Sequence, residues 1–265
     1  MAKRPEVEEE APLAVVPVTF NKGALAEVLG SEFAKQLADV AKDHAAQERP
    51  VMSKISLRGG VLQYMGAPVK GNRLPVVIIG MGYERTFYKD KFNPNVFANP
   101  SCFALSLNDE NMVPHENVEN PINEVCEGCK YNQWGSDLTG TRGKACKEKR
   151  RLIMIPEGAL TSAEDVQKAE IAFVQVPVMS VKGWSKYVNV LNASMGAPYF
   201  AVVTELALEP DPKSQYRLNF TALRLISDAD VLRAVMGRLE EAQKIALNPY
   251  DETQNQPPAE DSKKF

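Results

Sequence analysis

The sequence has few of the residues that carry acid–base and redox chemistry, since its 265 residues include only 2 histidines and 4 cysteines. The histidines, His44 and His115, leave few candidates for a general base. No apolar run approaches the roughly 18 to 20 residues that a membrane-spanning helix needs. The net charge is only −3 at pH 7, so a nucleic-acid partner must be argued from local charge.

The N-terminus lacks the apolar core of a secretory signal, because "MAKRPEVEEEAPLAVVP" carries acids where that core would lie. We therefore expect a cytoplasmic protein, in which the cysteines serve metal binding, redox chemistry or packing rather than disulfides. Residues 1–17 are predicted to be a disordered acidic segment, residues 18–248 a single domain, and residues 249–265 a flexible polar tail.

Most apolar residues occur in β-branched or alternating runs, which are typical of strands. The predicted strands are residues 74–88, 102–107, 151–156, 169–179, 199–209 and 216–226. Gly80 and Gly82 indicate a bulge or a close backbone approach within the first of these strands. Residues 52–66 predict a short hairpin, and the last two strands a longer one.

Three stretches, residues 24–42, 180–196 and 227–247, have the apolar periodicity of amphipathic helices. In the second, Ser180 is the predicted N-cap and Gly196 the predicted stop. Strands and helices do not alternate regularly, which disfavours a doubly wound sheet. We expect a mainly β or α+β fold, namely an antiparallel OB-like barrel with helical additions and a cysteine-rich metal-binding insertion.

All four cysteines lie in the one region, residues 89–150, that has little helical or strand periodicity. The cysteines are Cys102, Cys126, Cys129 and Cys146. The C-x2-C pair lets two thiolates converge on one ion, and the third cysteine follows 17 residues later, within the usual span of a zinc site. Metal binding would supply the folding energy that this region cannot obtain from an apolar core.

The predicted site is a closed, structural zinc site with four cysteine ligands, at about residues 100–151. His115 is an alternative to Cys102 as the fourth ligand. Ligand type alone also allows an iron–sulfur cluster. Zinc is favoured because nothing else in the chain indicates electron transfer.

Basic residues follow the C-x2-C pair closely, and two aromatic residues, Tyr131 and Trp134, lie among them. The basic residues are Lys130, Arg142, Lys144, Lys147, Lys149, Arg150 and Arg151. Only Asp137 and Glu148 oppose them. Cations for the backbone and flat rings for stacking are what a single-stranded nucleic-acid site needs. The alternatives are a solvated charged loop and a Trp134 packed inside the metal module.

A second patch of rings and cations, residues 82–92, strengthens the prediction of nucleic-acid binding. On a strand, Tyr83, Arg85 and Phe87 would share one face, and Tyr88 follows them. A sheet face that presents rings and cations is the usual platform for single strands. The alternative is an exposed edge strand that charges protect from aggregation.

The segment "PSCFAL" followed by "CEGCKYNQWGSDLTGTRGKACKEKRRL" resembles a cysteine motif of bacteriophage-encoded single-stranded-DNA-binding proteins. The resemblance covers about 50 residues, 101–151. It implies an OB-like fold with a zinc-binding insertion, sequence-independent binding of single strands during phage replication or recombination, and a location in the cytoplasm of an infected bacterium. It also implies a C-terminal tail that recruits replication or recombination proteins. "PPAEDSKKF" has the acids and the terminal Phe265, but Lys263 and Lys264 depart from that pattern.

Two other functions stay open on the sequence. A metal-dependent nuclease or other DNA-processing enzyme needs clustered carboxylates, and the candidates are Asp109 with Glu110 and Glu209 with Asp211. A phage adaptor protein would use the zinc module only for structure. We expect a DNA-binding protein without catalytic activity and without a membrane partner.

Overall fold

The computed structural model describes residues 31–33, 35–37, 40, 53–90 and 99–249. The strands are β1 (Ser53–Lys54), β2 (Gln63–Tyr64), β3 (Ala67–Pro68), β4 (Arg73–Phe87), β5 (Cys102–Ser106), β6 (Lys147–Pro156), β7 (Ala172–Val176), β8 (Val202–Asp211) and β9 (Gln215–Leu225). The α-helices are α3 (Ala163–Lys168), α4 (Val178–Met195), α5 (Ala229–Gly237) and α6 (Leu239–Ala246). The short 3-10 helices are η1 (Arg58–Gly60), η2 (Lys70–Asn72), η3 (Lys130–Asn132), η4 (Glu157–Ala159) and η5 (Tyr199–Ala201).

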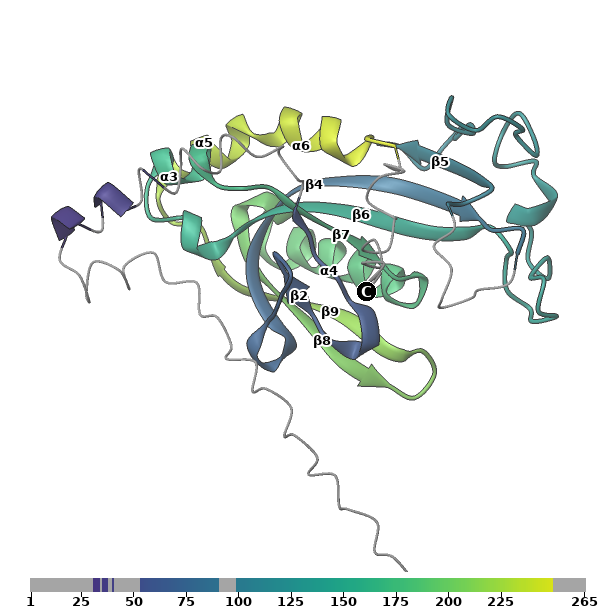
Figure 1. Cartoon of the computed structure of the whole chain (residues 1–265), viewed down its shortest axis with the longest axis horizontal. Helices are drawn as coiled ribbons and strands as arrows, with labels where there is room; N and C mark the ends of the chain where they lie inside the picture. Colours follow the sequence, from purple (N-terminus) through teal and green to yellow (C-terminus); the bar gives the residue numbers. More distant parts are fainter. Residues whose placement is uncertain (1–30, 34, 38–39, 41–52, 91–98, 250–265) are drawn as a thin grey trace, which may run out of the picture.

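A seven-stranded, mostly antiparallel sheet forms the centre of the molecule (Figure 1). Its order is β1-β7-β6-β4-β8-β9, with β5 pairing with β4. Only the β1–β7 pair of the described sheet is parallel. The expectation of a mainly antiparallel sheet with helices is therefore confirmed.

The expected OB-like barrel is wrong, because the sheet is open. A barrel would require β1 and β9, the two edges of the described sheet, to pair with each other. Strand β1 has only two residues and pairs with β7 alone, so it offers little edge for closure. Strand β4 also changes partner along its length, from β8 at Arg73–Val77 to β5 at Tyr83–Phe87.

Helices cover both faces of the sheet (Figure 1). Helix α4 packs Trp184, Tyr187 and Leu191 onto one face. Helices α3, α5 and α6 pack onto the other, where Val166 and Val235 are fully buried. Each face thus has its own apolar core, and the strands between them are apolar on both sides.

Strand β4 has the features that its two glycines predict. Its register with β6 shifts between Ile78 and Gly80, which marks a bulge. A Cβ atom at Gly80 would lie 2.8 Å from the Cβ atom of Ala242, so α6 rests almost directly on the strand backbone. The bulge also moves Tyr83, Arg85 and Phe87 to the face that α4 covers further along the sheet.

The start of α4 and the extent of the last predicted helix differ from the predictions, whereas the end of α4 agrees. Ser180 lies inside α4, where its buried hydroxyl accepts a hydrogen bond from the Leu218 backbone N–H at 2.9 Å. Asp228 caps α5, and the predicted helix 227–247 divides into α5 and α6 at Arg238. Gly196 ends α4 with a left-handed φ of 58°, as predicted.

The N-terminal predictions are tested only in part. The predicted hairpin in residues 52–66 reduces to one bridge between Ser56 and Gln63, while β1 joins the main sheet. Within the predicted helix 24–42, residues 31–33, 35–37 and 40 are helical, and the rest lies outside the described residues. The predictions for residues 1–17 and 250–265 also lie outside them.

Candidate metal centre and nucleic-acid interface

The ends of three paired strands position two of the four cysteines. Cys102 begins β5 directly opposite Phe87, the last residue of β4. Cys146 comes just before β6, whose first residue pairs with Thr86. The backbone N–H of Cys146 donates to the Tyr131 carbonyl at 2.8 Å, which ties the C-x2-C loop to the start of β6.

Tight turns hold the other two cysteines. The Cys129 N–H donates to the Cys126 carbonyl at 3.3 Å, and the Asn132 N–H donates to the Cys129 carbonyl at 3.0 Å. The buried Asn132 side chain donates to the Cys126 carbonyl at 2.8 Å and accepts from the Lys144 ammonium at 3.2 Å. The loop is therefore fixed by hydrogen bonds where it has little apolar core.

All four cysteines line one small cavity of about 20 Å³. This volume accommodates about one particle the size of a water molecule. Other lining residues are Phe87, Pro114, Ile122, Asn123, Val125, Tyr131 and Asn132. The structure thus brings together the four cysteines that the sequence singled out, from positions up to 44 residues apart along the chain.

Two of the thiols have pKa values that the neighbouring cysteines raise. Burial, reinforced by the three other cysteines, raises the pKa of the Cys146 thiol to about 12. Burial raises the pKa of the Cys102 thiol too, and Cys129 adds to that rise. Such thiols stay protonated at neutral pH unless a cation compensates the charge of their thiolates.

The thiols share the cavity without forming a closed set of ligands. In the described part of the chain, no group of three or more His, Cys, Asp or Glu side chains is arranged to hold a metal ion. The zinc site therefore stays a proposal, and its support comes from the shared cavity and from the residues around it. Four thiols are also the ligands of iron–sulfur clusters, but no other observation supports such a cluster here.

Arg85 is the observation that favours ionised thiols in this cavity. Its guanidinium is buried, with the residue only 7% exposed. Its Nε atom has no hydrogen-bond partner among the described residues, and its Nη1 atom lies 3.8 Å from a Glu127 oxygen, in an ion pair. Burial raises the pKa of the Cys126 thiol, and Arg85 lies close enough to oppose that rise. A buried cation beside these sulfur atoms, with an Nε–H that lacks a partner, fits thiolates that bind a divalent ion.

A zinc ion held by Cys102, Cys126, Cys129 and Cys146 would give this loop folding energy and leave no position for a catalytic water. His115 does not line the cavity. Its ring stacks on Phe103, with ring centroids 4.9 Å apart, and its Nδ1 atom accepts from the Asn117 N–H at 3.1 Å. The geometry thus favours Cys102 over His115 as the fourth ligand.

Phe87 is not a surface ring, so the structure does not place it where the predicted base stacking would require it. It is 4% exposed and stacks on Tyr131, with ring centroids 4.1 Å apart. Tyr131 is itself half-buried, and both rings line the cysteine cavity. These two rings form the small apolar core of the module, a role that the sequence left open for Trp134.

Three arginines predicted to contact nucleic acid, Arg85, Arg150 and Arg151, are buried and interact with other side chains of the protein. Arg85 forms an ion pair with Asp109 at 3.2 Å. Arg150 lies over the Tyr83 ring at 4.1 Å from its centroid, so this half-buried ring is also occupied. Arg151 pairs with the fully buried Glu84 at 3.0 Å.

Two lysines of the basic run are paired inside the module. The Lys147 ammonium lies 2.5 Å from an Asp137 oxygen, and the Lys144 ammonium lies 2.7 Å from a Glu148 oxygen. These pairs reduce the positive charge that the sequence assigns to the surface. The Lys147–Asp137 pair also fixes the loop that carries Trp134, since Asp137 accepts from the Thr139 N–H at 2.8 Å as well.

Trp134 stands out from this loop and is 80% exposed. The loop beneath it is rigidly tied: the Gly135 N–H donates to the Gly143 carbonyl at 3.0 Å, and the Ser136 hydroxyl donates to the Tyr131 carbonyl at 2.9 Å. The Lys144 ammonium lies over the Trp134 ring, 5.5 Å from its centroid. A large exposed ring on a fixed support, with a cation beside it, is typical of a stacking site.

Four other predicted contact residues lie around this module. Lys130 and Arg142 are both exposed, and the Lys130 ammonium lies 5.0 Å from the centroid of the Tyr131 ring. Tyr88 is exposed just after the end of β4, with the Lys149 ammonium 6.0 Å from the centroid of its ring. Fewer residues of the predicted interface are therefore accessible than the sequence pattern indicated.

The sequence did not single out Asp109 or Glu84 as partners of the arginines, nor Asn132 as the residue that holds the C-x2-C turn. Asp109 forms ion pairs with both Arg85 and Arg150, the latter at 3.8 Å. The strand pattern contained one usable signal, since an acid at Glu84 lies between two residues predicted for the opposite face. No local pattern identifies a loop residue such as Asp109 as the partner of a distant strand.

Three of the four carboxylates proposed for a nuclease are engaged elsewhere, and the fourth, Glu110, is exposed. Asp109 binds two arginines, while Asp211 forms an ion pair with Arg217 at 2.8 Å in the β8–β9 turn. Glu209 forms an ion pair with Arg73 at 2.6 Å. No observation among the described residues favours a two-metal site at these positions.

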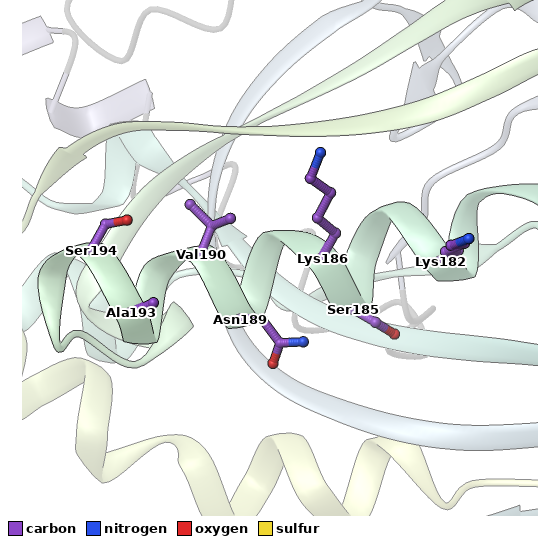
Figure 2. A pocket seen from close by; sticks show the side chains of 7 residues that line it. All are labelled: Lys182, Ser185, Lys186, Asn189, Val190, Ala193 and Ser194. Atoms are coloured by element: carbon purple, nitrogen blue, oxygen red, sulfur yellow. The ribbon is translucent and has the colours of Figure 1, made fainter.

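A shallow hollow runs along the exposed face of α4 (Figure 2), and it shares no lining residue with the cysteine cavity. It is lined by Lys182, Ser185, Lys186, Asn189, Val190, Ala193 and Ser194. All of these residues come from one helix, and none is an acid or a cysteine. The hollow therefore shows no set of converging groups of the kind that binding sites use.

Comparison with known proteins finds no relative, since no family model, curated protein or solved structure matches this chain. The fold and the geometry of the module are therefore the basis for a functional proposal. Among the described residues, no helix combines the length and the apolar character needed to cross a bilayer.

Proposed function

We propose that this protein binds single-stranded DNA without base specificity, as a non-enzymatic protein of phage replication or recombination. The observation that carries the proposal is the exposed Trp134 on its tied loop, with Lys144 over its ring. Stacking on such a ring contributes about 1 to 3 kcal/mol per base and tolerates every base. Base-independent stacking is what sequence-independent binding requires.

Charges beside the ring support a polynucleotide over another aromatic ligand. Lys130 and Arg142 lie at the surface near the C-x2-C loop, and Lys149 lies beside Tyr88. Each lysine or arginine that contacts a phosphate releases counterions and adds affinity that falls with salt. The proposed zinc ion would hold these residues on a rigid support, which reduces the entropy lost on binding.

The experiment is a titration of the full-length protein against a labelled single-stranded oligonucleotide and its duplex, at low and high salt, followed by fluorescence anisotropy. The expected result is tighter binding to the single strand, with affinity that falls steeply as salt rises. Equal affinity for duplex and single strand, or binding to neither, would contradict the proposal. Degradation of the oligonucleotide in magnesium would favour the nuclease instead.

Charge reversal distinguishes DNA binding from the adaptor role. Lys130→Glu and Arg142→Glu remove surface cations of the module, whereas Lys213→Glu changes an exposed residue in the β8–β9 turn. We expect the first two substitutions to weaken binding and the third to leave it nearly unchanged. If the three variants bind alike, the module serves structure alone.

A further inference from the structure

A row of charged side chains crosses four strands on the sheet face opposite the cysteine cavity. Cα partners in neighbouring strands point their side chains to the same face. Glu84 pairs with Lys149, and Gly82 pairs with Arg151, so these side chains share the face that α6 covers at Gly82. Arg151 in turn pairs with Gln175 of β7.

Lys54 of β1 extends the row across the next strand. It pairs with Phe173, which lies in the core beneath α3, α5 and α6, and its ammonium lies 5.8 Å from the centroid of the Phe173 ring. Burial lowers the pKa of Lys54, and Lys149 lies close enough for its charge to lower that pKa further. The row therefore gathers groups from β1, β7, β6 and β4.

Glu84 is the only acid of this row, and it is already engaged. Its carboxylate accepts from the Arg151 Nε atom at 3.0 Å and from the Gln175 side chain at 2.9 Å. Helix α6 ends just before this point, and Arg151 also donates to the Asn248 carbonyl. Glu84 and Gln175 thus hold Arg151 in place and leave the two lysines unneutralised.

Lys54 and Lys149 form no ion pair with any described residue. Burial lowers the pKa of both ammonium groups, and Arg151 lowers the pKa of each further, while Glu84 opposes these effects. Among the described side chains of this row, Glu84 is engaged with Arg151, and Lys54 and Lys149 are left as a local excess of positive charge. Such an excess on a partly desolvated sheet face is compensated most directly by a phosphate oxyanion.

We infer that Lys54 and Lys149, with Arg151 held by Glu84, form a second phosphate-binding site for the backbone of the bound strand. The inference rests on the proposed function and extends it to the opposite face of the β4–β6 ribbon. Lys149 also lies beside the Tyr88 ring, which follows β4, so the proposed phosphate site adjoins one of the exposed rings of the predicted interface. Trp134 would stack bases on one side, while Lys54 and Lys149 would contact phosphates on the other.

The test compares wild type with the double variant Lys54→Gln and Lys149→Gln by the salt dependence of binding to an oligothymidylate. Removing one phosphate neutralisation on a single strand lowers the slope of log K against log salt by about 0.7, so we expect a decrease of about 1.4. Lys213→Gln, in the exposed β8–β9 turn, is the matched control and should leave the slope unchanged. An unchanged slope in the double variant, or an equal decrease in the control, overturns the inference.

Inorganic pyrophosphate separates phosphate recognition from general charge. At constant ionic strength, it should displace the oligonucleotide from wild type at lower concentration than from the double variant. Equal displacement from both proteins would also overturn the inference. A wild-type protein that binds no single strand would instead refute the proposed function, so the two failures are distinguishable.

Discussion

Arg85 brings a buried positive charge to a cysteine cavity in which burial raises the pKa of three thiols, those of Cys102, Cys126 and Cys146. A zinc ion with four thiolates is an anionic centre, and a buried guanidinium compensates part of its charge. The Nε atom of Arg85, which has no hydrogen-bond partner among the described residues, would then find a sulfur acceptor, which removes the cost of leaving it unpaired. Asp109 keeps the guanidinium oriented from the other side.

The substitution Arg85→Met tests this role. Groups that surround a metal centre without binding the ion typically change metal affinity by about 10- to 100-fold, and we expect a decrease in that range. The measurement is the rate and extent of zinc transfer to a colorimetric chelator. Arg73→Met, at an exposed arginine of the same strand, is the control. Equal zinc retention in all three proteins would contradict a role for Arg85 at the metal.

The alternation of residues along β4 was predictable, but the accessibility of its faces was not. Tyr83, Arg85 and Phe87 do share one face, as their spacing indicates. The irregular segment 107–146 folds over that face and buries Arg85 and Phe87, and no periodicity reveals where such a loop lies. The exposure of Trp134 was not predictable either, because it depends on turns that form only in the folded loop.

At the scale of elements, β4 and α6 meet through glycine and alanine, which lets the helix approach the strand closely. A Cβ atom at Gly80 would also lie 3.2 Å from the Ala242 backbone, so the helix would have to move away. We expect Gly80→Ala to destabilise the fold by about 1 to 3 kcal/mol, as overpacking does. Urea unfolding measures the change.

Gly183 provides the matched control for that substitution. It lies within α4, and a Cβ atom there would have no heavy atom within 4 Å. Gly183→Ala should therefore stabilise the protein, by about 0.5 to 1 kcal/mol, through helix propensity. If both variants have the same effect, the contact between α6 and β4 is looser than described.

Element types followed well from the sequence, whereas their assembly did not. The long strands and the β8–β9 hairpin have clear local signals, and β4 occupies 73–87 where residues 74–88 were predicted. Closure into a barrel depends on whether two distant edges pair, which no local pattern encodes. In the described part of the chain, the sheet is open, and β1 contributes two residues to its edge.

At the scale of the whole molecule, two sources of stability are separate. The sheet has an extensive core on each face, whereas the apolar core that the described residues give the cysteine module is small: the stacked Phe87 and Tyr131 rings and a buried cluster of Ala104, Met112 and Cys126. A region with so little apolar core depends on its hydrogen bonds and on the proposed ion. Loss of that ion should therefore act locally.

Metal removal tests this division. Treatment with a strong chelator should increase amide hydrogen exchange in residues 107–146 and leave β8 and β9 protected. Replacing Cys129 with serine should have the same local effect in untreated protein. Uniform loss of protection across the sheet would show that the module is not separate, and unchanged exchange would contradict a bound ion.

The most direct test of DNA binding uses the two tryptophans of the chain, because Trp134 is 80% exposed and Trp184 is 2% exposed. Bases that stack on Trp134 should quench its emission. In a titration with an oligothymidylate, the account predicts quenching in wild type, reversal by added salt, and no quenching in Trp134→Phe, whose remaining emission comes from Trp184. Unchanged emission of wild type at saturating oligonucleotide, or equal quenching in the variant, would contradict the account.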